Sequence, residues 1–259
     1  MNTCPPKGSV HAVGKAMELL ELLFRWRGPM TLQQLTEASG YPKSTVHSLL
    51  STLREYGAVA QESGGRYCLG ARLYEYGCAV SSSWDAMAIA HPQLEQLARQ
   101  TGASAFISLL DGDFVISFDA YASSAGSGYQ ITPETGTRLP LHATAQGKLL
   151  LSMRSDSEVL RILQRSGMTP FTPHTITTPE RLLAALQEIR RLGYAVENGE
   201  YKIGLRAVAA PVYDYTGAVR YALGTVGLFR HTTSPEFQRA IELTAAQAKQ
   251  MSLDLRYRP

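Results

Sequence analysis

The segment GYPKSTVHSLLSTLREYGAV, residues 40–59, decides the fold of the first part of the chain, because its middle predicts a short amphipathic helix. Pro42 suits the first turn of a helix, since its ring fixes φ at a helical value, and Gly57 is typical of a helix end. At about 100° per residue one face is apolar, with Val46, Leu49, Leu50 and Leu53. The opposite face is polar and carries Ser44, His47, Ser48, Ser51 and Arg54.

This polar face consists mainly of short hydrogen-bonding side chains, not the mixture of Glu and Lys found on an ordinary solvated helix. Hydroxyl groups and the amino end of a helix suit phosphates, and His47 and Ser48 could reach base edges in the major groove of DNA. Lys43 and Arg54 would neutralise phosphates and make binding depend on salt. A solvated helix in an all-α domain remains the alternative on this segment alone.

The residues on either side of the segment favour the DNA-binding interpretation. Two helices are predicted before it, one over residues 13–26 with an apolar stripe at Val13, Met17, Leu20 and Phe24, and one over residues 31–39 capped by Thr31. After it, residues 58–60 and 66–69 flank a turn at 63–65 and predict a β-hairpin. This is the order of a winged helix-turn-helix, with Arg66 and Tyr67 next to the hairpin tip.

Composition permits this interpretation without requiring it. The chain has 259 residues, enough for one or two domains, and its net charge of +3 is only weakly basic. No segment near the start has the apolar core of a signal peptide, and no apolar run is as long as a membrane span, so we expect a cytoplasmic protein. Three cysteines, Cys4, Cys68 and Cys78, lack metal-ligand spacing and are expected to be reduced structural thiols.

The second half of the chain predicts a different architecture. Residues 71–83 are expected to form a helix ending in a break at 81–83. A second helix is expected from Trp84 to about residue 100, and Pro92 could kink or restart it. Strands are predicted on both sides of the Asp111–Asp113 turn and at 194–197, 205–213 and 219–228. Helices are predicted at 143–153, 155–165, 178–192 and 234–256, and the Gly/Ser-rich segment 123–130 is expected to be a flexible loop or a strand edge. The fold class is therefore α+β, with a central, largely antiparallel sheet.

The segment TLQQLTEASGYPKSTVHSLLSTLREYGAVAQESGGRYCLG resembles the winged helix-turn-helix of the isocitrate lyase regulator (IclR) family of bacterial transcription factors. LPLHATAQGKLLL and RLGYAVENGEYKIGLRAVAAPVYDYTGAVRYALGTVG resemble segments of that family's C-terminal domain. The resemblance implies a DNA-binding domain at 9–70, a linker helix at 71–83, and a GAF-like effector-binding and oligomerisation domain at 84–259. It also implies a homodimer or tetramer on a pseudo-palindromic operator.

The expected DNA contacts lie on the third helix and on the hairpin, and are Lys43, Ser44, Thr45, His47, Ser48, Ser51, Arg54, Arg66 and Tyr67. The family often has an arginine where this chain has Ser48, which indicates a different operator.

An effector pocket is expected where LHATAQGK starts a helix near residues 142–144. Free N–H groups at such a start, around Ala145 and Gln146, favour an anion such as a carboxylate. The resemblance adds walls at Glu197, Leu205, Ala207, Gly224 and Val226, and Gly224 and Val226 replace hydroxyl side chains of some relatives. We therefore expect a roomier, less polar pocket for an aromatic or larger organic acid. His142 could contact the carboxylate, and Tyr121 and Tyr129 could add aromatic walls.

Each of these pocket assignments has a structural alternative. Glu197 could be a surface carboxylate on a strand edge, His142 could hydrogen-bond neighbouring backbone, and the two tyrosines could be ordinary partly buried side chains. The six histidines lack metal-ligand spacing, so no metal and no cofactor are expected.

Enzyme motifs find no support in the sequence. Gly147-Lys148 lacks the glycine that a phosphate-binding loop requires five residues earlier, and no G-x-S-x-G elbow is present. The expected function is that of a ligand-responsive transcriptional regulator that binds a small organic acid. Repression is favoured over activation. A GAF-like ligand sensor or enzyme without a DNA-dependent role is the alternative.

Overall fold

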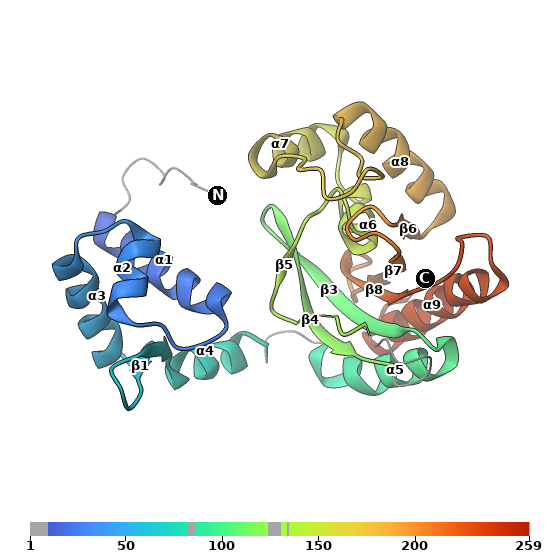
Figure 1. Ribbon diagram of the computed structural model, residues 1–259. Helices are drawn as coiled ribbons and strands as arrows, with labels where there is room; N and C mark the ends of the chain where they lie inside the picture. Colours follow the sequence, from blue (N-terminus) through green and yellow to red (C-terminus); the bar gives the residue numbers. More distant parts are fainter. Residues whose placement is uncertain (1–9, 82–85, 124–130, 134, 259) are drawn as a thin grey trace. The chain divides into compact units, whose positions relative to one another are not determined.

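The computed structural model describes residues 10–81, 86–123, 131–133 and 135–258 (Figure 1). The chain divides into two compact units, Met1–Trp84 and Asp85–Pro259. Several expectations fall outside the described residues: Tyr129 with the rest of 124–130, the break at 82–83, Trp84, and Cys4. Among the described residues, none of the helices is both long enough and apolar enough to cross a membrane.

The first unit contains the predicted three helices and hairpin in the predicted order. Helices α1 (His11–Trp26), α2 (Leu32–Ser39) and α3 (Lys43–Glu55) precede strands β1 (Val59–Gln61) and β2 (Tyr67–Leu69), and α4 (Ala71–Ser81) follows. Thr31 caps α2 in a reciprocal capping box with Gln34, as its position before the apolar run predicted. The core is formed by Leu19, Leu23, Met30, Leu35, Val46, Leu50, Val59 and Tyr67.

The buried face of α1 differs from the predicted stripe. Val13, Met17 and Phe24 are exposed by 61%, 60% and 44%, whereas Leu19 and Leu23 are buried against α2 and α3. The segment AMELLELLF is apolar on more than one side, so two stripes satisfy helical spacing. Tertiary packing selects the leucine stripe, which periodicity alone does not distinguish.

The second unit is built on one six-stranded antiparallel sheet with strand order β5-β4-β3-β8-β7-β6. Its strands are β3 (Ser104–Asp111), β4 (Phe114–Tyr121), β5 (Arg138–Leu139), β6 (Ala195–Asn198), β7 (Arg206–Tyr213) and β8 (Val219–Gly227). Its helices are α5 (Met87–Thr101), α6 (Ala145–Ser152), α7 (Asp156–Ser166), α8 (Pro179–Leu192) and α9 (Pro235–Asp254). The prediction of an α+β protein with a central antiparallel sheet is confirmed.

Helices cover both faces of this sheet. α5 and α9 pack on one face, and α6 packs on the other with α8 behind it (Figure 1). α5 continues through Pro92 without a restart. The two-residue strand β5 was not predicted, because two residues are too short to show alternation. The arrangement places the amino end of α6 over the middle of the sheet.

Candidate functional sites

The exposed side chains of α3 match the predicted polar face. Lys43, Ser44, His47 and Ser48 are exposed, while Thr45 and Ser51 are half-buried at its edges. Val46 and Leu50 are fully buried, and Leu49 and Leu53 pack on the same core. The helix is therefore held by its apolar face, and a row of short hydroxyl side chains and one imidazole faces solvent.

The amino end of α3 has hydrogen-bond donors to offer a ligand. Pro42 occupies the cap position, and no side chain within the described part of the chain caps this end. The first intrahelical acceptor is the Pro42 carbonyl, which receives the N–H of Val46. The earlier N–H groups of the first turn, beside the exposed Lys43, form an anion-binding arrangement.

The hairpin is attached to α3 by a side-chain contact. Arg54 Nη1 donates a hydrogen bond to Gln61 Oε1 on β1 at 2.6 Å. This contact fixes the hairpin relative to the exposed face of α3 while Arg54 remains exposed. Arg66, next to the 63–65 turn, is also exposed and keeps its expected position at the hairpin tip.

Tyr67 does not belong with the expected DNA contacts. Its side chain is buried in the core of the first unit, and its backbone forms an isolated bridge with Met30. The alternation of the hairpin turns the Tyr67 ring inward where Arg66 turns outward. The assignment of Tyr67 to the DNA contacts is corrected to a structural role at the base of the hairpin.

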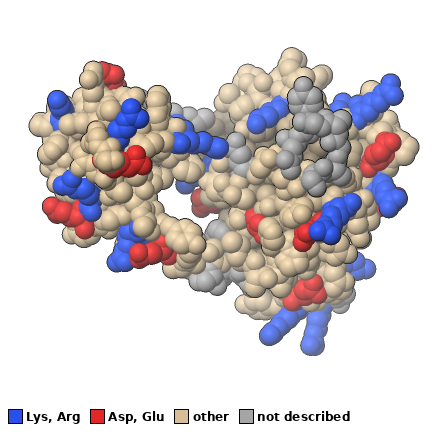
Figure 2. Space-filling model, turned by 60° about the horizontal axis from the view of Figure 1, so that its bottom comes forward, with Lys and Arg blue, Asp and Glu red and all other residues tan. Residues whose placement is uncertain are grey.

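Charged side chains of both signs are interspersed on the face drawn in Figure 2, without a continuous basic patch there. On this face, binding of a polyanion would depend on individual cations together with backbone and hydroxyl donors.

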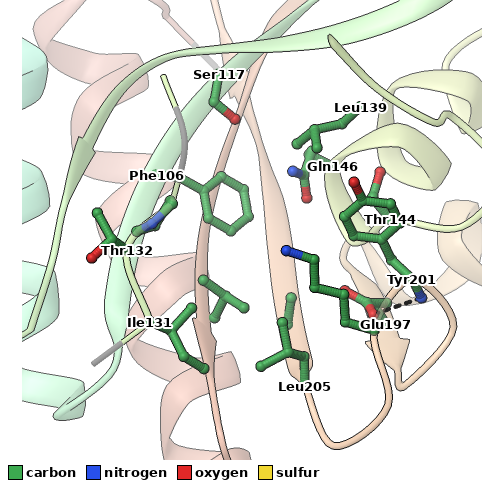
Figure 3. Close-up of a pocket in the computed structure, with 14 residues that line it drawn as sticks. Phe106, Ser117, Ile131, Thr132, Leu139, Thr144, Gln146, Glu197, Tyr201 and Leu205 are labelled. Atoms are coloured by element: carbon green, nitrogen blue, oxygen red, sulfur yellow. Dashed lines mark hydrogen bonds between the residues drawn. The ribbon is translucent and has the colours of Figure 1, made fainter. Parts of the chain in front are cut away.

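The second unit contains a cavity of about 100 Å³ between the sheet and the amino end of α6 (Figure 3). Apolar and polar side chains both line it. They are Phe106, Ser117, Ile131, Thr132, Pro133, Leu139, Thr144, Gln146, Glu197, Tyr201, Lys202, Leu205, Ala207 and Val226. Five of the expected pocket residues are in this set: Gln146, Glu197, Leu205, Ala207 and Val226.

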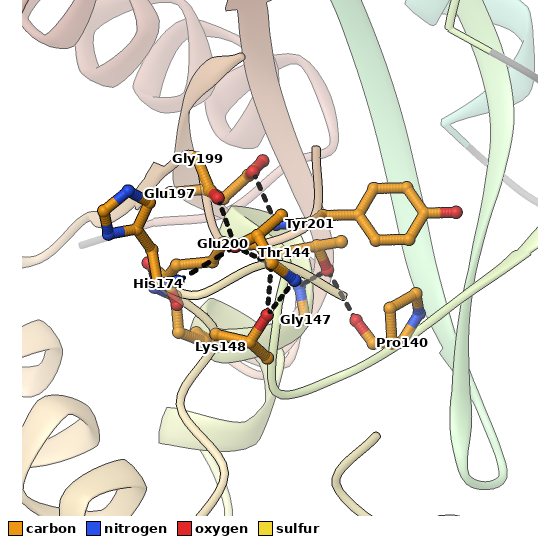
Figure 4. Close-up of polar contacts among 11 residues, drawn as sticks. Pro140, Thr144, Gly147, Lys148, His174, Glu197, Gly199, Glu200 and Tyr201 are labelled. Atoms are coloured by element: carbon orange, nitrogen blue, oxygen red, sulfur yellow. Dashed lines mark hydrogen bonds and ion pairs between the residues drawn. The ribbon is translucent and has the colours of Figure 1, made fainter. Parts of the chain in front are cut away.

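At the amino end of α6, beside this cavity, the first N–H groups have no hydrogen-bond acceptor among the residues that the structure describes. The Thr144 hydroxyl accepts the N–H of Gly147 at 3.2 Å and donates to the Pro140 carbonyl at 2.8 Å (Figure 4). The first intrahelical bond runs from the Lys148 N–H to the Thr144 carbonyl. The N–H groups of Ala145 and Gln146 come before these bonds, and both residues are buried. Buried free amides at a helix start favour a bound anion.

Glu197 is a buried acid in the cavity wall, not a surface carboxylate. It is 4% exposed, and its Oε1 accepts the Tyr201 N–H at 3.1 Å. Burial raises the pKa of Glu197 to about 7, and the nearby Glu200 acts in the same direction, while backbone N–H groups and Lys148 oppose the shift. Near neutral pH this carboxyl group can therefore exist as the acid and donate a hydrogen bond.

Lys148 does not neutralise Glu197, because it forms a buried ion pair with Glu200 (Figure 4). The pair joins α6 to the 199–205 loop that carries the cavity residues Tyr201 and Lys202. Glu200 Oε2 is buried without a hydrogen-bond partner among the described residues. The backbone of Glu200 is held by the hydroxyl of Thr175, which donates to its carbonyl at 2.6 Å.

Several expected pocket residues lie elsewhere. The His142 ring is buried outside the cavity lining and donates from Nε2 to the Thr169 carbonyl at 3.0 Å, which was its structural alternative. Burial lowers the pKa of His142, which favours the neutral form of the ring. Tyr121 donates to Glu95 at 3.2 Å on the α5 side and is not a wall of the cavity. Ala145 is not among the lining residues either, although it lies between Thr144 and Gln146, which are.

Gly224 does not line the cavity, so its missing side chain does not make the pocket roomier as expected. A Cβ at this position would lie 2.3 Å from Phe106 Cζ and 2.4 Å from the Val208 carbonyl oxygen. The Phe106 ring thus fills the space left by the missing side chain and lines the cavity in its place. The size and polarity of the pocket relative to those of IclR-family pockets stay predictions.

Sequence reasoning missed the cavity residues on strands β3, β4 and β5, which are Phe106, Ser117 and Leu139. Strand alternation predicts that Phe106 and Ser108 share a face, but only the sheet register shows which face is covered by α6. Thr144 could have been identified as the cap residue just before Ala145 and Gln146. Among the described residues, no group of three or more His, Cys, Asp and Glu side chains is placed to hold a metal ion.

Comparison with known proteins places both units. Residues 12–63 match the family model of the IclR helix-turn-helix domain, and residues 78–253 match that of the bacterial transcriptional regulator IclR C-terminal domain. The chain is 34% identical over 216 residues to the HTH-type transcriptional regulator XynR of Escherichia coli, covering 83% of this chain and 84% of XynR. It is 30% identical over 213 residues to the transcriptional repressor IclR of Escherichia coli, covering 82% of this chain and 78% of that one.

Solved structures agree with this placement. The crystal structure of an IclR transcriptional regulator from Alicyclobacillus acidocaldarius is 30% identical with a TM-score of 0.80, covering 95% of this chain and 99% of its own. The inducer-binding domain of a PobR double mutant from Acinetobacter, solved as a complex with 3-hydroxybenzoic acid, is 26% identical with a TM-score of 0.57. That match covers 64% of this chain and 96% of the domain.

The matched proteins are transcriptional regulators and not enzymes, and the two family models cover the helix-turn-helix unit and the sheet unit in the same order as this chain. This chain therefore belongs to the IclR family of bacterial DNA-binding transcriptional regulators, with a C-terminal effector-binding domain.

Proposed function

We propose that this protein is a repressor whose DNA affinity is controlled by a compact organic acid bound in the cavity of the second unit. The observation that carries the proposal is the pairing of buried, free amides at the amino end of α6 with an otherwise largely apolar cavity. The carboxylate of the acid receives the N–H groups of Ala145 and Gln146. Its body contacts Phe106, Leu205 and Val226.

The size of the cavity limits the ligand to an apolar body no larger than one ring. Its volume of about 100 Å³ is below the ~150 Å³ of an engineered apolar cavity that binds benzene. A ring therefore requires the side chains of Tyr201, which is half-buried, and Lys202, which is exposed, to rotate outward. The relative solved with 3-hydroxybenzoic acid supports a single-ring acid as the ligand class. Glu197, as the neutral acid, donates to an oxygen of the ligand.

On the DNA side, α3 enters the major groove and the hairpin contacts the flanking backbone. Lys43, Arg54 and Arg66 neutralise phosphates, and the hydroxyls of Ser44, Thr45 and Ser51 position the helix. His47 and Ser48 contact base edges. Two subunits bind a pseudo-palindromic site in the cytoplasm, and α4 contributes to the dimer. The support for the last point is that α4 exposes Tyr74, Tyr76 and Val80 by 76%, 56% and 53%.

The test selects preferred DNA sites from a randomised library with the wild-type protein and with variants of α3. His47→Ala and Ser48→Ala should change the selected sequence, because base contacts are lost. The matched control is Thr52→Ala, on the exposed part of the same helix outside the proposed contacts. Unchanged site selection by both variants, with affinity lowered equally on all sequences, would mean that they only position the protein. An unselective wild type would refute the DNA-reading role of α3.

A further inference from the structure

One wall of the cavity is determined by two residues, Phe106 and Gly224, which lie opposite each other on the neighbouring strands β3 and β8. Gly224 also lies opposite Ala209 on β7. Phe106 is only 2% exposed, and it lines the cavity. A phenyl ring beside a glycine in a sheet covers the backbone that the missing side chain leaves open.

The ring has no room to move toward the sheet. A Cβ on Gly224 would lie 2.3 Å from Cζ and 2.7 Å from Cε2 of Phe106, which shows how closely the ring edge approaches the Gly224 backbone. The same Cβ would lie 2.4 Å from the Val208 carbonyl oxygen, so the strands themselves also require glycine here. Because the Gly224 backbone lies directly beneath it, the ring cannot move toward the sheet when a ligand enters.

The side chains on another wall of the cavity are less enclosed. Tyr201 is half-buried and Lys202 is exposed, so these side chains have more room to rotate than the Phe106 ring. Figure 3 shows the Phe106 ring projecting from one side of the cavity, with Thr144, Gln146 and Glu197 on the other side. An acid held at the amino end of α6 therefore has its body directed against an aromatic ring that cannot move back toward the sheet.

We propose that Phe106, seated on Gly224, is the specificity-determining residue that limits the acid to a single ring and favours a flat aromatic one. The inference rests on the proposed function, because it requires an acid in this cavity. A flat ring packs on the phenyl group by offset or edge contacts, whereas a second fused ring collides with it. Replacing Phe106 by a small residue opens the volume of an aromatic ring at the sheet side of the cavity.

The experiment measures the binding of a series of acids to the full-length protein by isothermal titration calorimetry. The probes are pyruvate, benzoate and 2-naphthoate. The wild type should prefer benzoate to both others. In Phe106→Ala the affinity for benzoate should fall about tenfold, because the lost contact between aromatic rings changes Kd by about that factor. The variant should instead prefer 2-naphthoate. Phe106→Leu, which keeps much of the apolar bulk, should lie between the two.

The matched control is Phe118→Ala, which removes another buried phenyl ring from the same sheet outside the cavity lining. It should keep the wild-type order of ligands. If the wild type binds benzoate and neither Phe106 variant changes the order of the three acids, the role of Phe106 is refuted while the proposed function stands. If the wild type binds none of the acids, the acid-binding function and the inference both fail. Melting curves confirm that each variant is folded.

Discussion

Replacing Glu197 by Gln tests the environment of the cavity directly. Burial raises the pKa of Glu197 from 4.5 to about 7. At about 1.4 kcal/mol per pH unit, this shift corresponds to about 3 kcal/mol. Because the pKa is higher in the folded than in the unfolded protein, the favourable contribution is complete below about pH 4.5 and is lost as the pH rises through about 7. The amide side chain of the Glu197→Gln variant keeps an oxygen for the Tyr201 N–H but carries no charge at any pH, so the variant escapes this loss.

The assay is thermal unfolding of the wild type and of Glu197→Gln between pH 5 and pH 8. Near pH 5 the two proteins should melt at similar temperatures, since Glu197 is neutral in the folded state. By pH 8 the variant should have gained about 2–3 kcal/mol over the wild type. For a unit of this size such a gain corresponds to roughly 5–10 °C in Tm.

The control for this prediction is Glu188→Gln, which changes an exposed carboxylate paired with Arg191. Its difference from the wild type should stay small across the same pH range. A melting difference for Glu197→Gln that does not grow between pH 5 and pH 8 would refute the reasoning. Such a result would mean that water or a cation stabilises the Glu197 carboxylate in the folded protein, so that burial does not raise its pKa.

Three further outcomes follow from the same structure. The affinity of the wild type for benzoate, measured by calorimetry, should fall about tenfold per pH unit above pH 7, because ionised Glu197 repels the ligand carboxylate. The affinity of Glu197→Gln should not change over the same pH range. Lys43→Ala and Arg66→Ala should each weaken binding to all DNA sequences and reduce the slope of log K against log salt by about 1, and an unchanged slope would exclude a phosphate contact. Lys148→Met should lower the free energy of unfolding by about 3–5 kcal/mol, because it leaves the Glu200 charge buried and unpaired. A loss below about 1 kcal/mol in urea unfolding would contradict a buried ion pair.

The helix-turn-helix unit could be predicted in detail because local signals agree with the tertiary structure. Thr31 with Gln34, Pro42 and the 63–65 turn each mark a boundary that the structure keeps. The side of α1 that is buried could not be predicted, because Val13 and Leu19 belong to two apolar stripes of equal spacing. Only the packing partner distinguishes them.

The candidate site was predicted where it depends on a helix end and not where it depends on strand register. Gln146 follows from the start of α6, which the sequence marks with Thr144. The expected effect of Gly224 was wrong because the volume of a pocket depends on which cross-strand neighbour fills the space, here Phe106. Phe106 and Gly224 are 118 residues apart in the chain and meet only because β3 pairs with β8. The local sequence pattern gives no information about this strand pairing.

The central claim is that an acid in the cavity changes the affinity of the protein for DNA. The most direct measurement is fluorescence anisotropy of a labelled fragment from the region upstream of the protein's own gene, titrated with protein in the presence and absence of the acid bound most tightly in calorimetry. Coupling between two sites is typically about 5–150-fold in Kd, and we predict a change in this range for the wild type. An acid that binds the protein with micromolar affinity while the Kd for DNA stays the same would contradict the account.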